Sequence, residues 1–266
     1  MTRRGGFAVA RLGPVTRLLH LSDTHLHAAG AERLHPEIDP RARLEEVLDR
    51  VRAYGPFDAV VVTGDVCDDG SIEGAQAVRD LVEDLAPVVL AVPGNHDLPG
   101  PVGQVFGRPF AEVGPWHLVG ASTQVEGEVA GVGDGVLEAL HEIGERPAVL
   151  LMHHSIESRS THEWFTLGGR DEVVAAVEAH PAPLVILSGH THEAYEGRLG
   201  QAQLLGAPAT YYSIRHRGDE FDFVRDEFGA AVVNLDDTAL TAGVELVLLQ
   251  DRACAEDRIE LPDEEV

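Results

Sequence analysis

The chain has 266 residues, of which 45 are Asp or Glu and 20 are Lys or Arg, so its formal net charge at pH 7 is −25. Such a charge opposes binding to a nucleic-acid duplex, because proteins bind nucleic acid mainly through cations that meet phosphates. All 20 basic residues are Arg, which excludes chemistry that needs a lysine. With 44% hydrophobic residues, we expect a single globular domain over residues 1–250, followed by an acidic tail over residues 251–266.

Cysteine content and apolar runs indicate the compartment. Cys67 and Cys254 stand far apart in a chain too large to need disulfide bonds, which is typical of a protein from a reducing cytoplasm. The longest apolar runs, such as residues 86–92, are far shorter than the ~20 residues of a membrane span. Arg3 and Arg4 are not followed by the apolar stretch of a signal peptide. We therefore expect a cytoplasmic protein that does not bind membranes.

Short apolar runs alternate with helical patterns along the first two thirds of the chain. The apolar runs, rich in Val, Ile and Leu, are residues 15–21, 59–63, 88–92, 148–152 and 184–187. Nearly continuous apolar runs of this length are typical of strands buried on both faces. Helical patterns are expected over residues 40–51, with Asp39 as N-cap, 72–85 and 171–179. The alternation predicts an α/β architecture.

The remaining segments predict loops and further strands. Residues 99–115 are rich in Gly and Pro and residues 127–135 are rich in Gly, which predicts surface loops. After His192, shorter apolar pieces at residues 203–205, 230–235 and 244–249 predict additional strands.

Each of the five long apolar runs ends in side chains that can bind metals. The blocks are Asp23-Thr24-His25, Gly64-Asp65, Gly94-Asn95-His96-Asp97, His153-His154 and Gly189-His190-Thr191-His192. Any one block alone is typical of a turn or a helix cap. However, ligands of open α/β sheets bind at the carboxyl ends of the strands. Five consecutive strand ends of this kind therefore predict one shared site.

The residue types in these blocks favour a particular chemistry. The candidate ligands are Asp23, His25, Asp65, Asn95, His154, His190 and His192. Imidazole and carboxylate together suit Zn, Fe or Mn. Seven groups exceed the needs of one tetrahedral ion and suit two ions, about 3.5–4 Å apart, that share a bridging carboxylate. Such pairs act on the attacking and leaving oxygens of a displacement at phosphorus, so the natural reaction is hydrolysis of a phosphate ester.

In order and spacing, the five blocks resemble the calcineurin-like metallophosphoesterase superfamily from Leu19 to His192. The segments at residues 19–26 and 151–154 look most like the bacterial class III cyclic-nucleotide phosphodiesterases. The resemblance implies a four-layer α/β/β/α sandwich, and the similarity to the cyclic-nucleotide enzymes suggests a homodimer. Two stretches depart from the family pattern: residues 119–123 lack an Asp, and residues 127–135 lack a Pro-Gly start. These departures concern the subfamily and the substrate rather than the metal ligands.

The resemblance also implies a role for each residue. It assigns Asp23, His25 and His192 to one metal, assigns Asn95, His154 and His190 to the other, and makes Asp65 the bridge. His153 would be only a neighbour of the ligand His154. His96 would touch the phosphate or protonate the leaving oxygen, with Asp97 as the residue that orients it. A hydroxide that bridges the metals would attack phosphorus.

The favoured function is hydrolysis of a small phosphodiester, such as a 3',5'-cyclic nucleotide, by two Mn, Fe or Zn ions. A phosphomonoesterase or protein phosphatase on the same metals stays open, because loops rather than motifs decide whether a substituted phosphate fits. A non-catalytic scaffold is opposed by the presence of all seven ligands. Two further residues carry expectations: His20 is a buried hydrogen-bonded residue, and Trp164 is a candidate to stack on a base at the mouth of the site.

Overall fold

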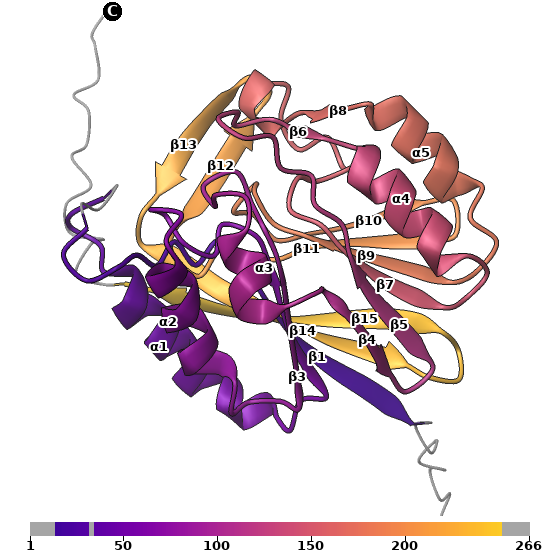
Figure 1. Ribbon diagram of the computed structural model, residues 1–266, viewed down its shortest axis with the longest axis horizontal. Coiled ribbons are helices and arrows are strands. Elements are labelled where there is room, and N and C mark those ends of the chain that lie inside the picture. The colour runs from indigo at the N-terminus through magenta and orange to yellow at the C-terminus, as the bar shows by residue number, and fades with distance from the viewer. Residues whose placement is uncertain (1–13, 32–34, 252–266) are drawn as a thin grey trace, which may run out of the picture.

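Two large β-sheets pack face to face in the computed structural model, which describes residues 14–31 and 35–251 (Figure 1). The first sheet has the strand order β15–β14–β1–β2–β3, with β1 Val15–Leu21, β2 Ala59–Thr63, β3 Val88–Val92, β14 Glu227–Asp236 and β15 Thr241–Gln250. The second has the order β10–β11–β9–β7–β5–β4, with β4 Phe110–Val113, β5 Trp116–Gly120, β7 Ala148–Leu151, β9 Leu184–Ser188, β10 Tyr195–Leu199 and β11 Ala202–Gly206.

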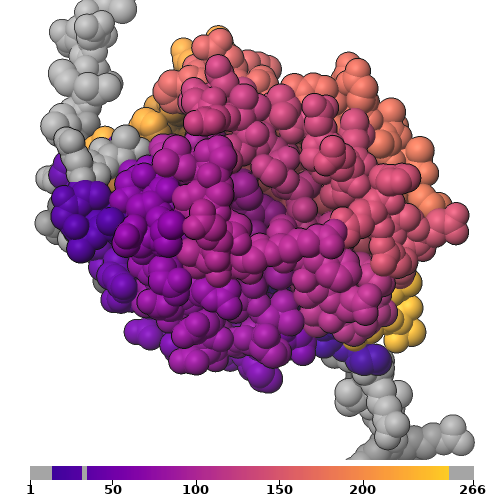
Figure 2. All heavy atoms as spheres, viewed as in Figure 1, coloured from indigo at the N-terminus to yellow at the C-terminus, as the bar shows by residue number. Residues whose placement is uncertain are grey.

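Helices cover the two outer faces. Those packed on the first sheet are α1 Pro40–Val51, α2 Ile72–Val82 and α3 Pro101–Phe106, and those on the second are α4 Asp134–Ile143 and α5 Arg170–Glu178. The space-filling view shows α1 and α2 on the left, in indigo and purple, and α5 on the right, in orange-pink (Figure 2). The predicted four-layer α/β/β/α sandwich is therefore confirmed.

The alternation of side chains along β2 shows how the layers hold together. All five residues of β2 are buried. Val60 and Val62 pack in the core beneath α1 and α2, whereas Ala59 and Val61 pack in the core between the two sheets. Successive side chains of a strand point to opposite faces, so an unbroken apolar run supplies both cores at once.

Helix α1 begins and ends as its sequence indicates. The Asp39 side chain accepts hydrogen bonds from the backbone N–H groups of Arg41 and Ala42, and Pro40 occupies the first turn. These features satisfy or avoid the unpaired N–H groups at a helix start. Leu44, Leu48 and the other apolar residues of α1 are buried on the face toward the first sheet.

Parallel pairing brings the candidate ligands together. Strands β1, β2 and β3 are parallel neighbours, and β5, β7, β9 and β11 are parallel neighbours in the second sheet. Parallel strands of one sheet end at the same edge. The segments that follow β1, β2 and β3 therefore share one edge, and those that follow β7 and β9 share another. The backbone N–H of His190 donates to Asp23 and joins the two edges, which is the placement that the sequence predicted.

Several segments differ from the predictions. Residues 99–115 contain α3 and β4 rather than only a loop, because Gly and Pro bound a helix of six residues that is too short to show a clear period. Helix α4 was not predicted, and its first residues overlap the Gly-rich stretch that also holds β6, Gly131–Val132. The β-hairpin of β12 Ser213–Arg217 and β13 Glu220–Val224 was also missed.

Three short elements complete the fold. Strand β8, Leu167–Gly168, pairs with β6, and 3₁₀ turns span Arg52–Tyr54 and Glu163–Phe165. None of the helices in the described part of the chain is both long and apolar enough to cross a membrane. Of the predicted acidic tail over residues 251–266, only Asp251 lies inside the described residues, so the role of the tail stays a prediction.

Candidate metal centre

All five predicted blocks meet in the structure. Their ligand atoms form two neighbouring groups within which every atom lies within 4.8 Å of the others. One group holds Asp23, His25, Asp65 and His192, and the other holds His153, His154 and His190. Asn95 lies beside the second group, because its Oδ1 is 3.0 Å from His153 Nε2.

Backbone strain is concentrated at these residues. Six non-glycine residues in the described part of the chain have a positive φ, and five of them are candidate ligands: Asp23, His25, Asp65, His190 and His192. A side chain in this conformation costs about 1–3 kcal/mol, and such residues cluster at functional sites. All five residues lie in the segments that directly follow β1, β2 and β9.

Hydrogen bonds fix the orientation of four imidazole rings. The Nδ1–H of His153 donates to the Thr63 carbonyl at 2.8 Å. The second nitrogen of this ring, Nε2, then faces the centre, 3.4 Å from Asp65 Oδ2. His190 Nε2 donates to the Trp164 carbonyl at 2.8 Å, and His192 Nδ1 donates to the Tyr212 carbonyl at 2.7 Å.

The ring of His25 is also oriented by a hydrogen bond, but its acceptor is a carboxylate rather than a backbone carbonyl. Its Nδ1 donates to Asp68 Oδ1 at 3.0 Å, which leaves Nε2 facing His192 Nε2 at 3.4 Å. Metal-binding histidines almost always donate their second ring N–H to a carbonyl or a carboxylate. The site therefore presents four imidazole nitrogens whose orientation suits metal ligation.

His153 and His154 differ in the hydrogen-bond partners of their ring nitrogens. His153 turns Nε2 toward Asn95 and Asp65. His154 uses both nitrogens: Nδ1 lies 2.7 Å from Thr123 Oγ1, and Nε2 lies 2.9 Å from the Val129 carbonyl. The ring that faces the bridging carboxylate is thus that of the residue expected to be only a neighbour.

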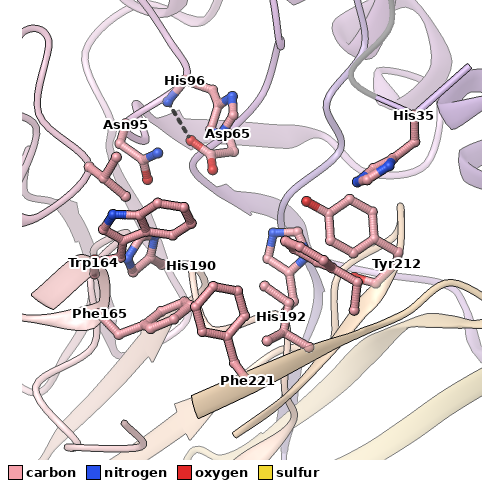
Figure 3. Close-up of a pocket in the computed structure, with 13 residues that line it drawn as sticks. His35, Asp65, Asn95, His96, Trp164, Phe165, His190, His192, Tyr212 and Phe221 are labelled. Atoms are coloured by element: carbon pink, nitrogen blue, oxygen red, sulfur yellow. Dashed lines mark hydrogen bonds between the residues drawn. The ribbon is translucent and has the colours of Figure 1, made fainter. Parts of the chain in front are cut away.

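Asp65 belongs to the first group and also contacts the second. Its Oδ2 is 3.4 Å from His153 Nε2 and 3.7 Å from His25 Nε2, and its Oδ1 accepts the backbone N–H of His96 at 2.9 Å (Figure 3). Only 3% of its side chain is exposed. A carboxylate in this position can share its oxygens between two ions.

Electrostatics favour cations at the site. Burial raises the pKa of Asp23, but the charge of His192 and its hydrogen bond outweigh burial and lower that pKa to about 2. Burial likewise opposes the charge of Asp65, yet the neighbouring histidines hold its pKa well below the ordinary value.

Asp65 in turn shifts the pKa of His153. Burial lowers the pKa of His153, but the charge and hydrogen bond of Asp65 raise it to about 9. Buried carboxylates need such a counter-charge, and a metal cation supplies it as well as a proton does. The donor set and its charge therefore fit divalent cations.

His96 has a different partner from the one predicted. Its Nδ1 lies 2.8 Å from Asp68 Oδ1, so Asp68 holds both His25 and His96. The expectation that Asp97 orients His96 is wrong. Asp97 is buried and accepts the backbone N–H groups of Val66, Cys67 and Gly94, so it joins the loops that follow β2 and β3.

Asp68 contacts two histidines of the candidate site, and the sequence pattern does not single it out. It stands three residues after Asp65, in a loop where an Asp is ordinarily a turn or cap residue. His20 behaves as expected: it is fully buried, and its Nε2 lies 2.8 Å from Thr63 Oγ1 rather than in the site.

A pocket of about 340 Å³ opens onto the candidate ligands Asp65, Asn95, His190 and His192. Figure 3 shows Asp65, Asn95 and His96 on one side of this pocket and Phe165 and Phe221 across from them. Its size is at the lower end of the ~300–1,000 Å³ of small-molecule sites. The site can therefore take a small molecule.

Comparison with known proteins agrees with this geometry. The model of the calcineurin-like phosphoesterase family matches residues 16–194. The chain therefore belongs to the calcineurin-like phosphoesterase family and is an enzyme that hydrolyses phosphoesters.

Two curated relatives carry narrower names. The chain is 29% identical over 244 residues to a 3',5'-cyclic adenosine monophosphate phosphodiesterase from Pseudomonas aeruginosa, which covers 86% of this chain and 89% of the relative. It is 28% identical over 199 residues to a probable cyclic nucleotide phosphodiesterase from a Synechococcus species, which covers 66% of this chain and 77% of the relative.

Solved structures support the fold. A dimetal phosphatase from Danio rerio superposes with a TM-score of 0.53 at 13% identity and covers 89% of this chain and 99% of its own. A purple acid phosphatase from yellow lupin has a TM-score of 0.50 at 12% identity and covers 90% of this chain and 54% of its own.

Proposed function

We propose that the protein is a binuclear metal-dependent phosphodiesterase that hydrolyses a small phosphodiester of the cyclic-nucleotide type. The observation that carries the proposal is the position of Asp65, whose carboxylate belongs to one group of metal-ligand atoms and also contacts the other. The names of the two curated relatives support the choice of a cyclic-nucleotide diester.

In this proposal Asp23, His25 and His192 hold one ion, and Asn95, His190 and a histidine of the β7 block hold the other. We assign that last position to His153 rather than to His154. The support is that His153 Nε2 lies within 3.4 Å of both Asn95 Oδ1 and Asp65 Oδ2. Both nitrogens of His154 already have partners outside the centre.

The ions, which we expect to be Mn, Fe or Zn, supply Lewis-acid chemistry: they draw charge from the phosphate and make hydroxide available near neutral pH. The chain's own residues hold and orient the reactants. His96 lies beside Asp65 at the pocket, and its Nδ1 is held by Asp68. Its Nε2 is thus the atom that gives a proton to the leaving oxygen.

A comparison of two substrates tests the proposal. Purified Mn-loaded protein is assayed with bis(p-nitrophenyl) phosphate and with p-nitrophenyl phosphate, and His96→Ala is the control variant. We expect a preference for the diester, and loss of turnover in His96→Ala with metal content unchanged. A preference for the monoester would favour a phosphomonoesterase or a protein phosphatase. No turnover of either substrate would contradict the assignment of diesterase activity.

Two further predictions concern the cellular location and the oligomeric state of the protein. We propose a cytoplasmic location, which the buried free thiol of Cys67 supports, since reduced cysteines are typical of that compartment. The homodimer implied by the family resemblance stays a prediction, which sedimentation of the purified protein would test.

A further inference from the structure

The walls of the pocket away from the candidate ligands are aromatic. Trp164 and Phe165 come from the 3₁₀ turn before β8, Phe221 and Phe223 come from β13, and Tyr212 precedes β12. Trp164 and Phe223 are the only aromatic residues exposed in the described part of the chain, and both line this pocket. Exposed apolar side chains gathered at one site mark a binding surface.

Two of these aromatic residues are tied directly to candidate metal ligands. The carbonyl of Trp164 accepts the Nε2–H of His190, and the carbonyl of Tyr212 accepts the Nδ1–H of His192. Each residue therefore orients a metal ligand with its backbone and lines the pocket with its ring. This arrangement fixes the backbone of both residues next to the candidate ligands.

The β12–β13 hairpin completes the aromatic wall. Phe221 and Phe223 are two residues apart on β13, so their side chains lie on the same face of the hairpin. The Phe221 ring centroid is 5.6 Å from that of Trp164 and 5.3 Å from that of Phe165. Figure 3 shows Trp164, Phe165 and Phe221 on one side of His192 and Tyr212 on the other. We call the pocket volume between these rings the aromatic slot.

The carboxylate of the pocket lies on the ligand side. The described lining residues include Asp65 but no Arg. Of the four lining histidines, only His35 lies among the aromatic rings, with its ring centroid 4.9 Å from that of Tyr212 and 5.7 Å from that of Phe223. A group that occupies the slot gains from apolar contact and from stacking rather than from ion pairing. A flat aromatic group fits such walls best.

We propose that the aromatic slot selects the ester group of the substrate, so that the enzyme prefers phosphoesters of planar aromatic groups, such as nucleosides, over those of sugars or simple alcohols. Trp164 and Phe221 are the residues that determine this specificity. The proposal rests on the proposed function for the position of the phosphate, but it concerns only the group that the phosphate carries.

Ligand binding tests this selectivity without relying on turnover. Isothermal titration of the Mn-loaded protein compares AMP with ribose 5-phosphate, which share the phosphate and the ribose and differ in the base. Stacking of one base on an aromatic side chain corresponds to about 10-fold or more in affinity. We therefore expect AMP to bind about 10-fold or more tightly than ribose 5-phosphate.

Variants then locate the selectivity. Trp164→Ala is expected to bring the ratio of the two affinities close to one, whereas Trp164→Phe retains most of it. Leu246→Ala, which removes an exposed apolar side chain outside the pocket, serves as the control and leaves the ratio unchanged. Metal content of each variant shows whether the backbone link to His190 has been kept.

The outcomes separate the two proposals. Equal affinities of AMP and ribose 5-phosphate in the unaltered protein would overturn the aromatic slot, even if the protein hydrolyses diesters. An unchanged ratio in both Trp164→Ala and Phe221→Ala would also overturn it. A clear preference for AMP without diester turnover would support the slot and contradict the proposed diesterase activity.

Discussion

Asp68 links the metal centre to the proposed proton donor. Its Oδ1 lies 3.0 Å from His25 Nδ1 and 2.8 Å from His96 Nδ1. Burial raises the pKa of Asp68, but hydrogen bonds from both histidines outweigh burial and keep the carboxylate ionised. A single carboxylate therefore orients both a candidate metal ligand, His25, and the proposed proton donor, His96.

Replacement of this carboxylate should affect both functions. We expect Asp68→Asn to weaken metal binding and to lower kcat/KM by about 10–100-fold, the usual effect of removing an outer partner of a ligand histidine. Titration calorimetry with Mn and steady-state kinetics measure the two effects. Asp69→Asn is the matched control, because Asp69 contacts Ala28 and Ser71 instead of a histidine. Equal behaviour of the two variants would contradict the role given to Asp68.

Gly94 is required by the close approach of the loop to Asp65. A Cβ at Gly94 would overlap the Asp65 carboxylate and its backbone nitrogen, whereas a Cβ at Gly103 in α3 would meet nothing within 4 Å. We expect Gly94→Ala to lose metal binding, because the Asp65 side chain must move. Gly103→Ala should keep metal binding and be at least as stable, since Ala is favoured over Gly in helices by roughly 0.5–1 kcal/mol. Metal titration and urea unfolding of both variants check this contrast.

At the scale of residues, the sequence predicts which residues gather at the site better than it predicts how their side chains are oriented. The blocks that follow the strands single out Asp23, Asp65 and the other candidate ligands, because each of these residues follows an apolar run. Which of two adjacent histidines faces the centre depends on the twist of the backbone after β7 and on acceptors such as the Thr63 carbonyl. Those acceptors come from other strands, so a local pattern does not reveal them.

At the scale of elements, β1 carries a buried polar network beneath the site. His20 Nε2 lies 2.8 Å from Thr63 Oγ1, and the Thr63 hydroxyl donates to Ser22 Oγ at 2.9 Å. His20 Nε2–H must therefore donate to Thr63, and Nδ1 is buried without a hydrogen-bond partner. Burial lowers the pKa of His20 to about 3, against an ordinary value of 6.5.

This pKa predicts a loss of stability in mild acid. The unfolded chain takes up a proton at His20 below pH 6.5 whereas the folded chain does not, so the free energy of unfolding falls as the pH drops from 6.5 toward 3. Between pH 7 and pH 5.5 the metal-free protein should lose about 1 kcal/mol more than His20→Gln, whose amide does not titrate. Urea unfolding at both pH values measures the difference. Identical pH slopes would show that His20 makes no such contribution.

Helices and strands were predicted correctly where the spacing of apolar residues is regular over the whole element. Helices α1, α2 and α5 and the five long apolar strands were expected close to their observed bounds. Helix α4 carries buried residues at Val136, Leu140 and Ile143, a helical spacing that the preceding glycines obscured. Hairpin β12–β13 alternates apolar with charged residues over only five positions per strand, so its strands resemble a polar loop.

On the scale of the whole molecule, the sandwich places a cation site within a strongly acidic chain. The formal net charge is −25, and the carboxylates of Asp23 and Asp65 add buried negative charge where the two sheets meet. Bound cations would offset that charge and attract an anionic phosphate to an otherwise repulsive surface. Charge and fold are therefore consistent with a small phosphoester substrate and inconsistent with a long polyanion.

We propose that this fold holds two metal ions that share Asp65 as a ligand. The most direct measurement is the number of Mn ions bound per chain at saturation, determined by elemental analysis of the unaltered protein, Asn95→Ala and Asp65→Ala. We predict two ions in the unaltered protein, one in Asn95→Ala and none in Asp65→Ala, with circular dichroism confirming that each variant is folded. A single ion in the unaltered protein, or two ions retained by folded Asp65→Ala, would contradict the binuclear centre.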